Sequence, residues 1–320
     1  NSSRKCKRRY MRILFMGTPE FAVPSFKSLL ESSHELVGVV TAPDKPVGRG
    51  LKIRPTPIKK AALEFNIPIF QPAELKDWEF INKIRSLEAH LFVVVAFRIL
   101  PAEVFKLPPK GTINLHASLL PKYRGAAPIN WAIINGEKET GVTTMYIQEK
   151  VDAGDIILQK KVEIGEEETA GELHDKLATW GAKLLLQTVD LIDENRAPRS
   201  HQKGEVTKAP KITRELGHIQ WKKPASEIRN LIRGLCPSPG AYTCVDGKLM
   251  KIFRTKICDE SRSPRSPGEI VAVKPKLGSI EVATGSGTLE ILELQPEGKR
   301  RMLASEFLRG HALKVGDKFG

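Results

Sequence analysis

The sequence predicts an α/β domain with a doubly wound, mostly parallel sheet, followed by a small β-barrel domain. Short apolar runs alternate with helical patterns through the first half of the chain, which is typical of a parallel sheet covered by helices on both faces. Short strand-like runs separated by glycine or proline occupy the last third, which is typical of a small barrel. A polar, proline-containing stretch lies between the two patterns.

The N-terminal half repeats a strand–helix–strand unit. RILFM (12–16) is a short apolar run, an apolar segment follows at 21–30, and LVGVV (36–40) is a second buried run. LFVVVAF (91–97) is a largely β-branched run of the kind found in a central parallel strand. Further elements are predicted as helices at 59–66, 80–88 and 172–192 and as a short strand at 68–70. The domain is therefore Rossmann-like, and such domains bind ligands beyond the carboxyl ends of their strands.

The C-terminal part combines a small helix with several short strands. The helix is expected at 224–235, and FLRGHAL (307–313) follows the last strand. The strands are expected at 241–245, 249–257, 268–273, 279–284 and 288–294. This pattern favours an OB-like β-barrel, although the spacing fits other small barrels as well. We therefore expect a disordered basic tail at 1–10, the α/β domain at 11–195, a linker at 196–215 and the barrel at 216–320.

The composition argues against several classes of protein. No run approaches the length of a membrane-spanning helix, and the first ten residues are basic with no apolar stretch behind them, so neither a membrane anchor nor a secretory signal is expected. Cys6, Cys236, Cys244 and Cys258 lack a CxxC spacing and are too few to staple a chain of 320 residues. We expect free thiols in the cytoplasm and no metal site.

The positive charge is concentrated in one part of the chain. Residues 196–320 hold 24 Lys and Arg against 13 Asp and Glu, a net charge of +11 out of +14 for the whole chain. Excess lysine can simply keep a protein soluble. Because the excess is concentrated in the C-terminal part, we favour binding to a nucleic acid.

The stretch GTINLHASLLPKYRGAAP (111–128) carries the best candidates for chemistry. If TINLH is a strand, Asn114 and His116 point to the same face, because side chains alternate along a strand. An amide and an imidazole aimed one way can bind an oxyanion and handle a proton. Such a pair alone is more often structural, but the segments behind it form a loop beyond a strand end, where binding residues usually collect.

A candidate acidic partner lies in EKVDAGDIILQKKV (149–162), where Asp152 and Asp155 bracket a tight turn. Both aspartates can be simple turn residues. One carboxylate facing His116 would instead orient the imidazole and favour its protonated form. The spacing alone does not choose between the two.

NLHASLLPKYRGAAP together with VDAGDIIL resembles the signature of the folate-dependent formyltransferases, and RILFMGTPEFAVPSF (12–26) resembles members that act on methionyl-tRNA. The resemblance runs from Met11 to near the C-terminus. It implies that Asn114, His116 and Asp152 are the catalytic residues. It also implies a tetrahydrofolate-binding loop formed by Ser118, Leu119, Leu120 and Pro121.

The resemblance implies transfer of the formyl group of 10-formyltetrahydrofolate to the α-amine of initiator methionyl-tRNA. Asn114 and protonated His116 would stabilise the tetrahedral oxyanion. Asp152 would keep His116 charged and help move the proton from the amine to the leaving nitrogen. The family reaction requires no metal, and a monomer is expected on the same ground.

The basic loop TAPDKPVGRGLKIRPTPIKKAA (41–62) is a candidate tRNA-binding segment. By composition alone it fits a solvated surface loop equally well. In the relatives that it resembles, this loop is the insert that reaches the acceptor stem of the initiator tRNA, and the GRG arginine matches Arg49. The candidate contacts are Lys45, Arg49, Lys52 and Arg54. Contacts of this kind with phosphate would make binding salt-dependent.

Two alternatives remain open. The formyl acceptor could be a small amine, such as glycinamide ribonucleotide or an amino-sugar nucleotide, although such a substrate requires neither the basic loop nor the basic C-terminal part. The chain could also be a non-catalytic RNA-binding protein, against which the intact set of candidate catalytic residues argues. One departure from the family pattern is Arg98, which stands in AFRILP where glycine is usual, close to the expected folate pocket.

Overall fold

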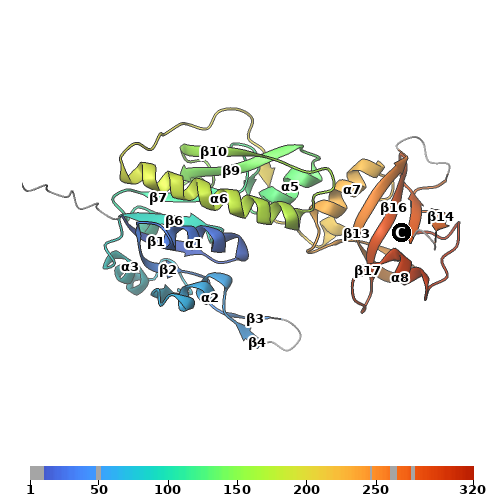
Figure 1. The fold of residues 1–320 in the computed structure, drawn as a ribbon, viewed down its shortest axis with the longest axis horizontal. Coiled ribbons are helices and arrows are strands. Elements are labelled where there is room, and N and C mark those ends of the chain that lie inside the picture. Colours follow the sequence, from blue (N-terminus) through green and yellow to red (C-terminus); the bar gives the residue numbers. More distant parts are fainter. Residues whose placement is uncertain (1–10, 48–51, 246, 260–264, 275–277) are drawn as a thin grey trace, which may run out of the picture. The chain divides into compact units, whose positions relative to one another are not determined.

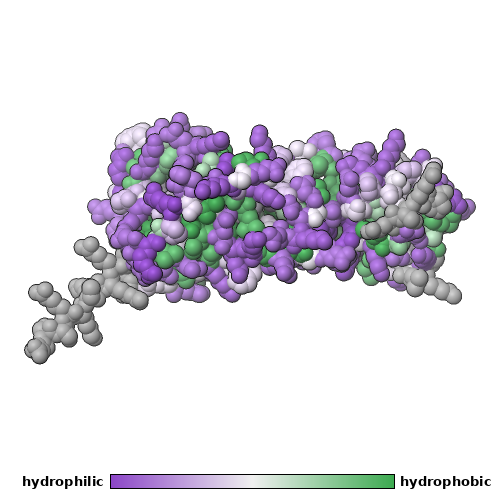
Figure 2. All heavy atoms as spheres, turned by 90° about the horizontal axis from the view of Figure 1, so that it is seen from above, coloured by the Kyte–Doolittle hydropathy of each residue, from purple (hydrophilic) through white to green (hydrophobic). Residues whose placement is uncertain are grey.

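The computed structural model describes residues 11–47, 52–245, 247–259, 265–274 and 278–320, so the predicted tail at 1–10 lies outside the described residues. The chain forms two compact units. Among the described residues, the N-terminal unit comprises those up to 125 together with 141–162 and 174–208, and the C-terminal unit comprises those at 126–140, 163–173 and from 209 onward. On the face drawn in Figure 2, hydrophilic residues cover most of the surface, with hydrophobic residues scattered between them.

The N-terminal unit is built on a seven-stranded sheet in the order β10-β9-β7-β6-β1-β2-β5 (Figure 1). The strands are β1 (Arg12–Gly17), β2 (Glu35–Val40), β5 (Ile69–Phe70), β6 (Leu91–Val95), β7 (Thr112–His116), β9 (Glu139–Tyr146) and β10 (Ile156–Glu163). From β5 to β7 the neighbours pair in parallel, and β7 pairs antiparallel with β9. The prediction of a doubly wound, mostly parallel sheet is confirmed.

Helices cover both faces of this sheet. They are α1 (Val23–Leu30), preceded by the 3-10 turn η1 (Glu20–Ala22), α2 (Pro57–Glu64), α3 (Trp78–Arg85), α4 (Ala102–Phe105) and α6 (Ala170–Asp193). On one face, Leu14 and Phe92 belong to a buried cluster with Phe80 of α3. On the other face, Phe15 meets Phe26 of α1 edge to face, with ring centroids 5.7 Å apart. Because both faces are buried, these strands read as continuous apolar runs.

The strand β9 is missing from the prediction, because its threonine-rich sequence reads as polar. In the structure Thr143 and Thr144 are fully buried. Their hydroxyls are satisfied inside the unit, since Thr143 Oγ1 donates to Ser118 O at 2.6 Å and Thr144 Oγ1 lies 2.8 Å from Thr188 Oγ1. A buried hydroxyl with such partners carries little penalty, so threonine can occupy a central strand.

The C-terminal unit is an antiparallel sheet with helices packed against it. Its strands follow one another in the order β12 (Ala241–Val245), β13 (Lys248–Asp259), β16 (Thr288–Pro296), β15 (Ser279–Ala283) and β14 (Ile270–Lys274), and β17 (Met302–Leu303) pairs with β16. Its helices are α5 (Pro128–Ile134), the 3-10 turn η2 (Glu215–Gly217), α7 (Ala225–Gly234) and α8 (Ala304–Leu308). The prediction of a small domain of antiparallel strands after the α/β domain is confirmed.

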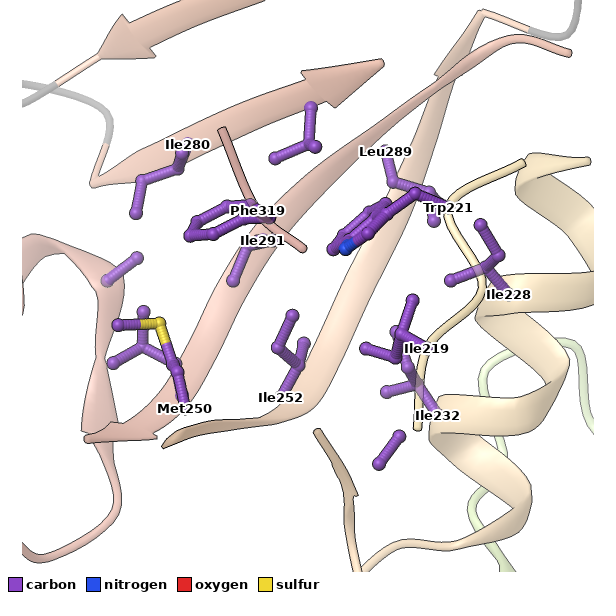
Figure 3. Close-up of a cluster of buried hydrophobic side chains, with 14 of the residues drawn as sticks. Ile219, Trp221, Ile228, Ile232, Met250, Ile252, Ile280, Leu289, Ile291 and Phe319 are labelled. Carbon is purple, nitrogen blue, oxygen red and sulfur yellow. The ribbon is translucent and has the colours of Figure 1, made fainter. Parts of the chain in front are cut away.

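The last residues of the chain join the two edge strands of this sheet. The backbone N–H of Ile270 on β14 donates to Asp317 O at 2.8 Å, and the N–H of Gly320 donates to Cys244 O on β12 at 3.1 Å. Between these contacts, Phe319 lies in the core and stacks on Trp221, with centroids 5.7 Å apart (Figure 3). This closure covers both sheet edges with backbone hydrogen bonds, as in a barrel.

The segment that carries α5 packs within the C-terminal unit although it precedes β9 in sequence. Asn130 Nδ2 on α5 donates to Gly234 O at the end of α7 at 2.7 Å. None of the helices in the described part of the chain has the length and apolar composition needed to cross a bilayer.

Candidate active site

Strand β7 presents Asn114 and His116 at the carboxyl end of the parallel sheet. Ile113 and Leu115 are buried on its opposite face, where Leu115 packs so closely on Gly181 of α6 that a Cβ there would lie 2.7 Å from Leu115 Cδ2. Because side chains alternate along a strand, Asn114 and His116 both point away from α6. The structure therefore brings these two predicted residues to one face.

The imidazole of His116 is held between a carbonyl and a carboxylate. Its Nε2 lies 2.9 Å from Tyr123 O, and its Nδ1 lies 3.8 Å from Asp152 Oδ1. A carbonyl oxygen only accepts hydrogen bonds, so Nε2 is assigned the proton and Nδ1 is left facing the carboxylate. The side chains of His116 and Asp152 are only 7% and 11% exposed, so solvent screens little of the interaction between the ring and the carboxylate.

Asp152 is held by a hydrogen bond from outside its turn and has an unusual backbone conformation. Its Oδ2 accepts a hydrogen bond from the backbone N–H of Gly125 at 2.9 Å. Its φ of 52° lies in the left-handed region, which is costly for a residue with a Cβ and persists only where surrounding contacts enforce it. Asp155 instead pairs with His201 Nδ1, 2.5 Å from its Oδ1. Of the two aspartates that the spacing left open, Asp152, which the resemblance implied, is the one beside His116.

Asn114 has a side-chain amide without a hydrogen-bond partner among the described residues, and the residue is half-buried. Its neighbours across the sheet are Val94 on β6 and Met145 on β9. Neither neighbour offers a polar side chain to the amide. The amide donors are thus left for a ligand at the carboxyl end of the sheet.

The loop Ser118–Pro121 begins two residues after the end of β7 and is hydrogen-bonded to β9 and β10. Thr143 Oγ1 donates to Ser118 O at 2.6 Å and accepts from the N–H of Leu120 at 3.2 Å. Gln159 Nε2 donates to Leu120 O and to Thr143 Oγ1, both at 2.9 Å. These contacts use the backbone polar groups of the loop and fix its course. The sequence did not predict that Thr143 and Gln159 hold this loop, because each resembles an ordinary polar residue of a strand.

Side chains of this loop are largely buried. Ser118 is fully buried, and its hydroxyl donates to Lys122 O at 2.6 Å. Leu120 is 3% exposed, and the side chain of Leu119 lies against Gly141, where a Cβ would approach it to 2.5 Å. The side chains of this loop therefore pack into the unit, and this packing fixes the loop beside the strand that carries His116.

The basic loop contains an antiparallel ribbon formed by β3 (Lys45–Val47) and β4 (Lys52–Arg54). Lys45 and Arg54 are directly paired and exposed, so their side chains lie on one face of the ribbon. Arg49 lies outside the described residues, and Lys52 is placed only as a strand residue paired with Val47. The structure thus brings two of the four predicted tRNA contacts together.

An ion pair is formed by Asp44, the residue that precedes β3. Lys59 Nζ donates to Asp44 Oδ2 at 2.6 Å, and Gln71 Nε2 donates to Asp44 Oδ1 at 2.7 Å. The hydrogen bond from Lys59, followed by that from Gln71, holds the pKa of the Asp44 carboxyl below its ordinary value of 3.8. Lys59 therefore forms an ion pair within the protein and is not counted among the candidate tRNA contacts.

Arg98 also forms hydrogen bonds within the protein. Its guanidinium donates to Pro72 O at 2.8 Å and to Ala73 O at 2.9 Å, in the segment after β5. The side chain that replaces the usual glycine thus ties two loops together at the carboxyl edge of the sheet. Among the described residues, no three His, Cys, Asp or Glu side chains group as metal ligands would.

Residues 11–189 match the family model described as formyl transferase, and residues 211–312 match that of the formyl transferase C-terminal domain. A methionyl-tRNA formyltransferase from Alkaliphilus oremlandii is 51% identical over 314 residues, which cover 97% of this chain and all of that protein. One from Pelotomaculum thermopropionicum is 48% identical over 311 residues, covering 97% of this chain and 99% of that protein.

Among solved structures, HypX from Aquifex aeolicus in complex with tetrahydrofolic acid aligns with a TM-score of 0.65 at 20% identity, over 97% of this chain and 51% of that one. This likeness shows the shared fold. The predicted resemblance to the formyltransferases is confirmed. The chain belongs to the formyl transferase family and, within it, to the methionyl-tRNA formyltransferases.

Proposed function

We propose that this enzyme transfers the formyl group of 10-formyltetrahydrofolate to the α-amine of initiator methionyl-tRNA. The observation that carries the proposal is the convergence of Asn114, His116 and Asp152 at the carboxyl end of the parallel sheet, with His116 Nδ1 and Asp152 Oδ1 3.8 Å apart. Ligands of doubly wound folds bind at this end.

The neutral amine attacks the formyl carbon, a C–N bond forms, and the carbonyl oxygen becomes an oxyanion. The free amide of Asn114 and the Nδ1 proton of the His116 imidazolium stabilise that charge, since Nε2 is occupied by Tyr123 O. Removing one such donor typically costs about 3 kcal/mol of transition-state stabilisation. Both donors are built into the sheet, so neither has to be ordered when the charge develops.

Asp152 handles the proton. Its carboxylate stabilises the charged form of His116 and accepts the proton that the amine loses on attack, directly or through water. That proton passes to the leaving nitrogen of the folate as its bond to the formyl carbon breaks. The products are the formylated amine and tetrahydrofolate, so no covalent intermediate on the enzyme is required.

The two substrates use different surfaces. The loop Ser118–Pro121, held by Thr143 and Gln159, forms one side of the folate-binding site. Lys45, Arg49, Lys52 and Arg54 of the basic loop contact the acceptor end of the tRNA, and the part of the chain at 216–320, within the strongly basic C-terminal region, binds its backbone. We propose further that the enzyme acts as a cytoplasmic monomer.

The test is formyl transfer from 10-formyltetrahydrofolate to charged initiator tRNA by the purified chain. His116→Ala and Asp152→Ala are expected to abolish turnover while the affinity for tRNA stays close to that of the original protein. Asp155→Ala is the matched control, because Asp155 lies in the same turn but pairs with His201. Faster transfer to glycinamide ribonucleotide or an amino-sugar nucleotide than to tRNA would contradict the proposal.

A further inference from the structure

The segment 200–202 lies inside the stretch predicted as a linker, yet it is bound to the turn that carries Asp152. Ser200 and Ile156 exchange two backbone hydrogen bonds, of 2.8 and 3.0 Å, just after that turn. Gln202 then directs its side chain back to the turn. The linker therefore forms part of the surroundings of the candidate active site.

The side-chain amide of Gln202 uses all of its hydrogen-bonding capacity. Nε2 donates to Asp152 O and to Gly154 O, each at 2.9 Å. Oε1 accepts from Arg124 Nε at 3.1 Å and from Arg124 Nη2 at 2.5 Å. Two donors and two acceptor sites are the full capacity of a carboxamide. A carboxylate would keep the contacts to Arg124 and lose both donors.

The hydrogen bonds of Gln202 reach two parts of the protein that position the Asp152 carboxylate. One is the left-handed backbone of Asp152, whose carbonyl receives a Gln202 hydrogen bond. The other is the strand Arg124–Gly125, whose Gly125 N–H binds Asp152 Oδ2. Gln202 is hydrogen-bonded to both, so it links the turn that carries Asp152 to the strand that binds its carboxylate.

We infer that Gln202 is a positioning residue for Asp152: it holds the strained turn against the strand Arg124–Gly125, so that Oδ1 faces Nδ1 of His116. This inference rests on the proposed role of Asp152. Without Gln202 the turn loses the contacts that offset its strain, and the carboxylate moves away from the imidazole. Displacements of about 1 Å at a reacting group can reduce turnover about 10²-fold.

The variants are Gln202→Ala and the nearly isosteric Gln202→Glu, which retains the Arg124 contact but cannot donate to the two carbonyls. Both are expected to lower kcat about 10²-fold with little change in KM for the folate or the tRNA. His201→Ala is the matched control, because its exposed ring forms its ion pair with Asp155 and not with Asp152, and its kcat is expected to stay unchanged. If Gln202→Ala does not fold, as judged by thermal unfolding, Gln202→Glu carries the test.

The decisive measurement repeats the Gln202 substitution in an Asp152→Asn background, which removes the carboxylate charge and leaves a reduced turnover to measure. If Gln202 acts through Asp152, the substitution causes no further loss of residual turnover there. An equal loss in both backgrounds would overturn the inference, since it would indicate a general structural effect, and so would a folded Gln202→Glu protein with unchanged kcat. The Asp152→Ala variant separates the two proposals. Full activity of Asp152→Ala would contradict the proposed function. An inactive Asp152→Ala protein together with a fully active Gln202→Glu protein would contradict only the inference about Gln202.

Discussion

The carboxylate of Asp152 faces the imidazole of His116 across 3.8 Å from Oδ1 to Nδ1, and both side chains are nearly buried. Because Nε2 is bound to Tyr123 O, the Asp152 side of the ring is where a proton can be exchanged. Asp152→Asn keeps the shape and removes the charge. We expect kcat to fall at least about 10²-fold, because the imidazolium loses its counter-charge in a low-dielectric site. Steady-state kinetics with both substrates varied measures this, and an unchanged kcat would contradict it.

Asn114 provides a second test, because its amide is free to meet a developing oxyanion. Asn114→Ala is expected to lower kcat/KM by about 10²- to 10³-fold through loss of one donor. Stability should change little, since the amide has no partner among the described residues that the substitution would strand. Steady-state kinetics and thermal unfolding on the same preparation measure the change in kcat/KM and the change in stability. A large loss of stability would mean that Asn114 is structural.

Thr143 links the folate loop to the sheet through Ser118 O and Leu120 N. Thr143→Val leaves these buried groups unpaired, so we expect a destabilisation of roughly 1–3 kcal/mol and a raised KM for the folate. Thr144→Val is the matched control, because that hydroxyl bonds to Thr188 rather than to the loop. Urea unfolding and folate saturation curves separate the effects. Equal changes in folate KM for the two variants would contradict the role of Thr143.

Lys45 and Arg54 lie opposite each other on the ribbon of β3 and β4. If each contacts a phosphate, Lys45→Ala and Arg54→Ala should each weaken tRNA binding and reduce the slope of log affinity against log salt concentration by about 1. Lys27→Ala, on α1, removes one charge elsewhere and should leave that slope unchanged. Binding titrations at several salt concentrations measure it. Identical slopes for all three variants would place the tRNA on another surface.

Asp44 gives a pH-dependent prediction for stability. Hydrogen bonds from Lys59 and Gln71 hold its pKa below the ordinary value of 3.8, so the ionised form stabilises the fold above that value. The contribution is lost as the pH falls through the lower folded-state value. Asp44→Asn should therefore be less stable than the original protein at pH 7, with the difference narrowing below pH 3.8. Urea midpoints across that range test this, and a constant difference would contradict it.

Much of the fold could be predicted because its elements carry local signals. The apolar runs of β1, β2 and β6 and the capped start of α6, where Thr169 and Glu172 hydrogen-bond to each other, are visible in the sequence. β9 was missed because burial of Thr143 and Thr144 depends on partners distant in sequence. The closing contacts of Asp317 and Gly320 were missed for the same reason.

The sequence by itself determined the parallel sheet, the pairing of Asn114 with His116 on one strand face, and the family. These follow from periodicity and from a contiguous motif. The spacing left Asp152 and Asp155 open and the resemblance implied Asp152, but only the tertiary structure places Asp152 beside His116 and shows that Gln202 of the expected linker binds the same turn. The physical reason is that the two aspartates are equivalent in local spacing, and their difference arises from a left-handed backbone and from hydrogen bonds to residues 27 to 50 positions away.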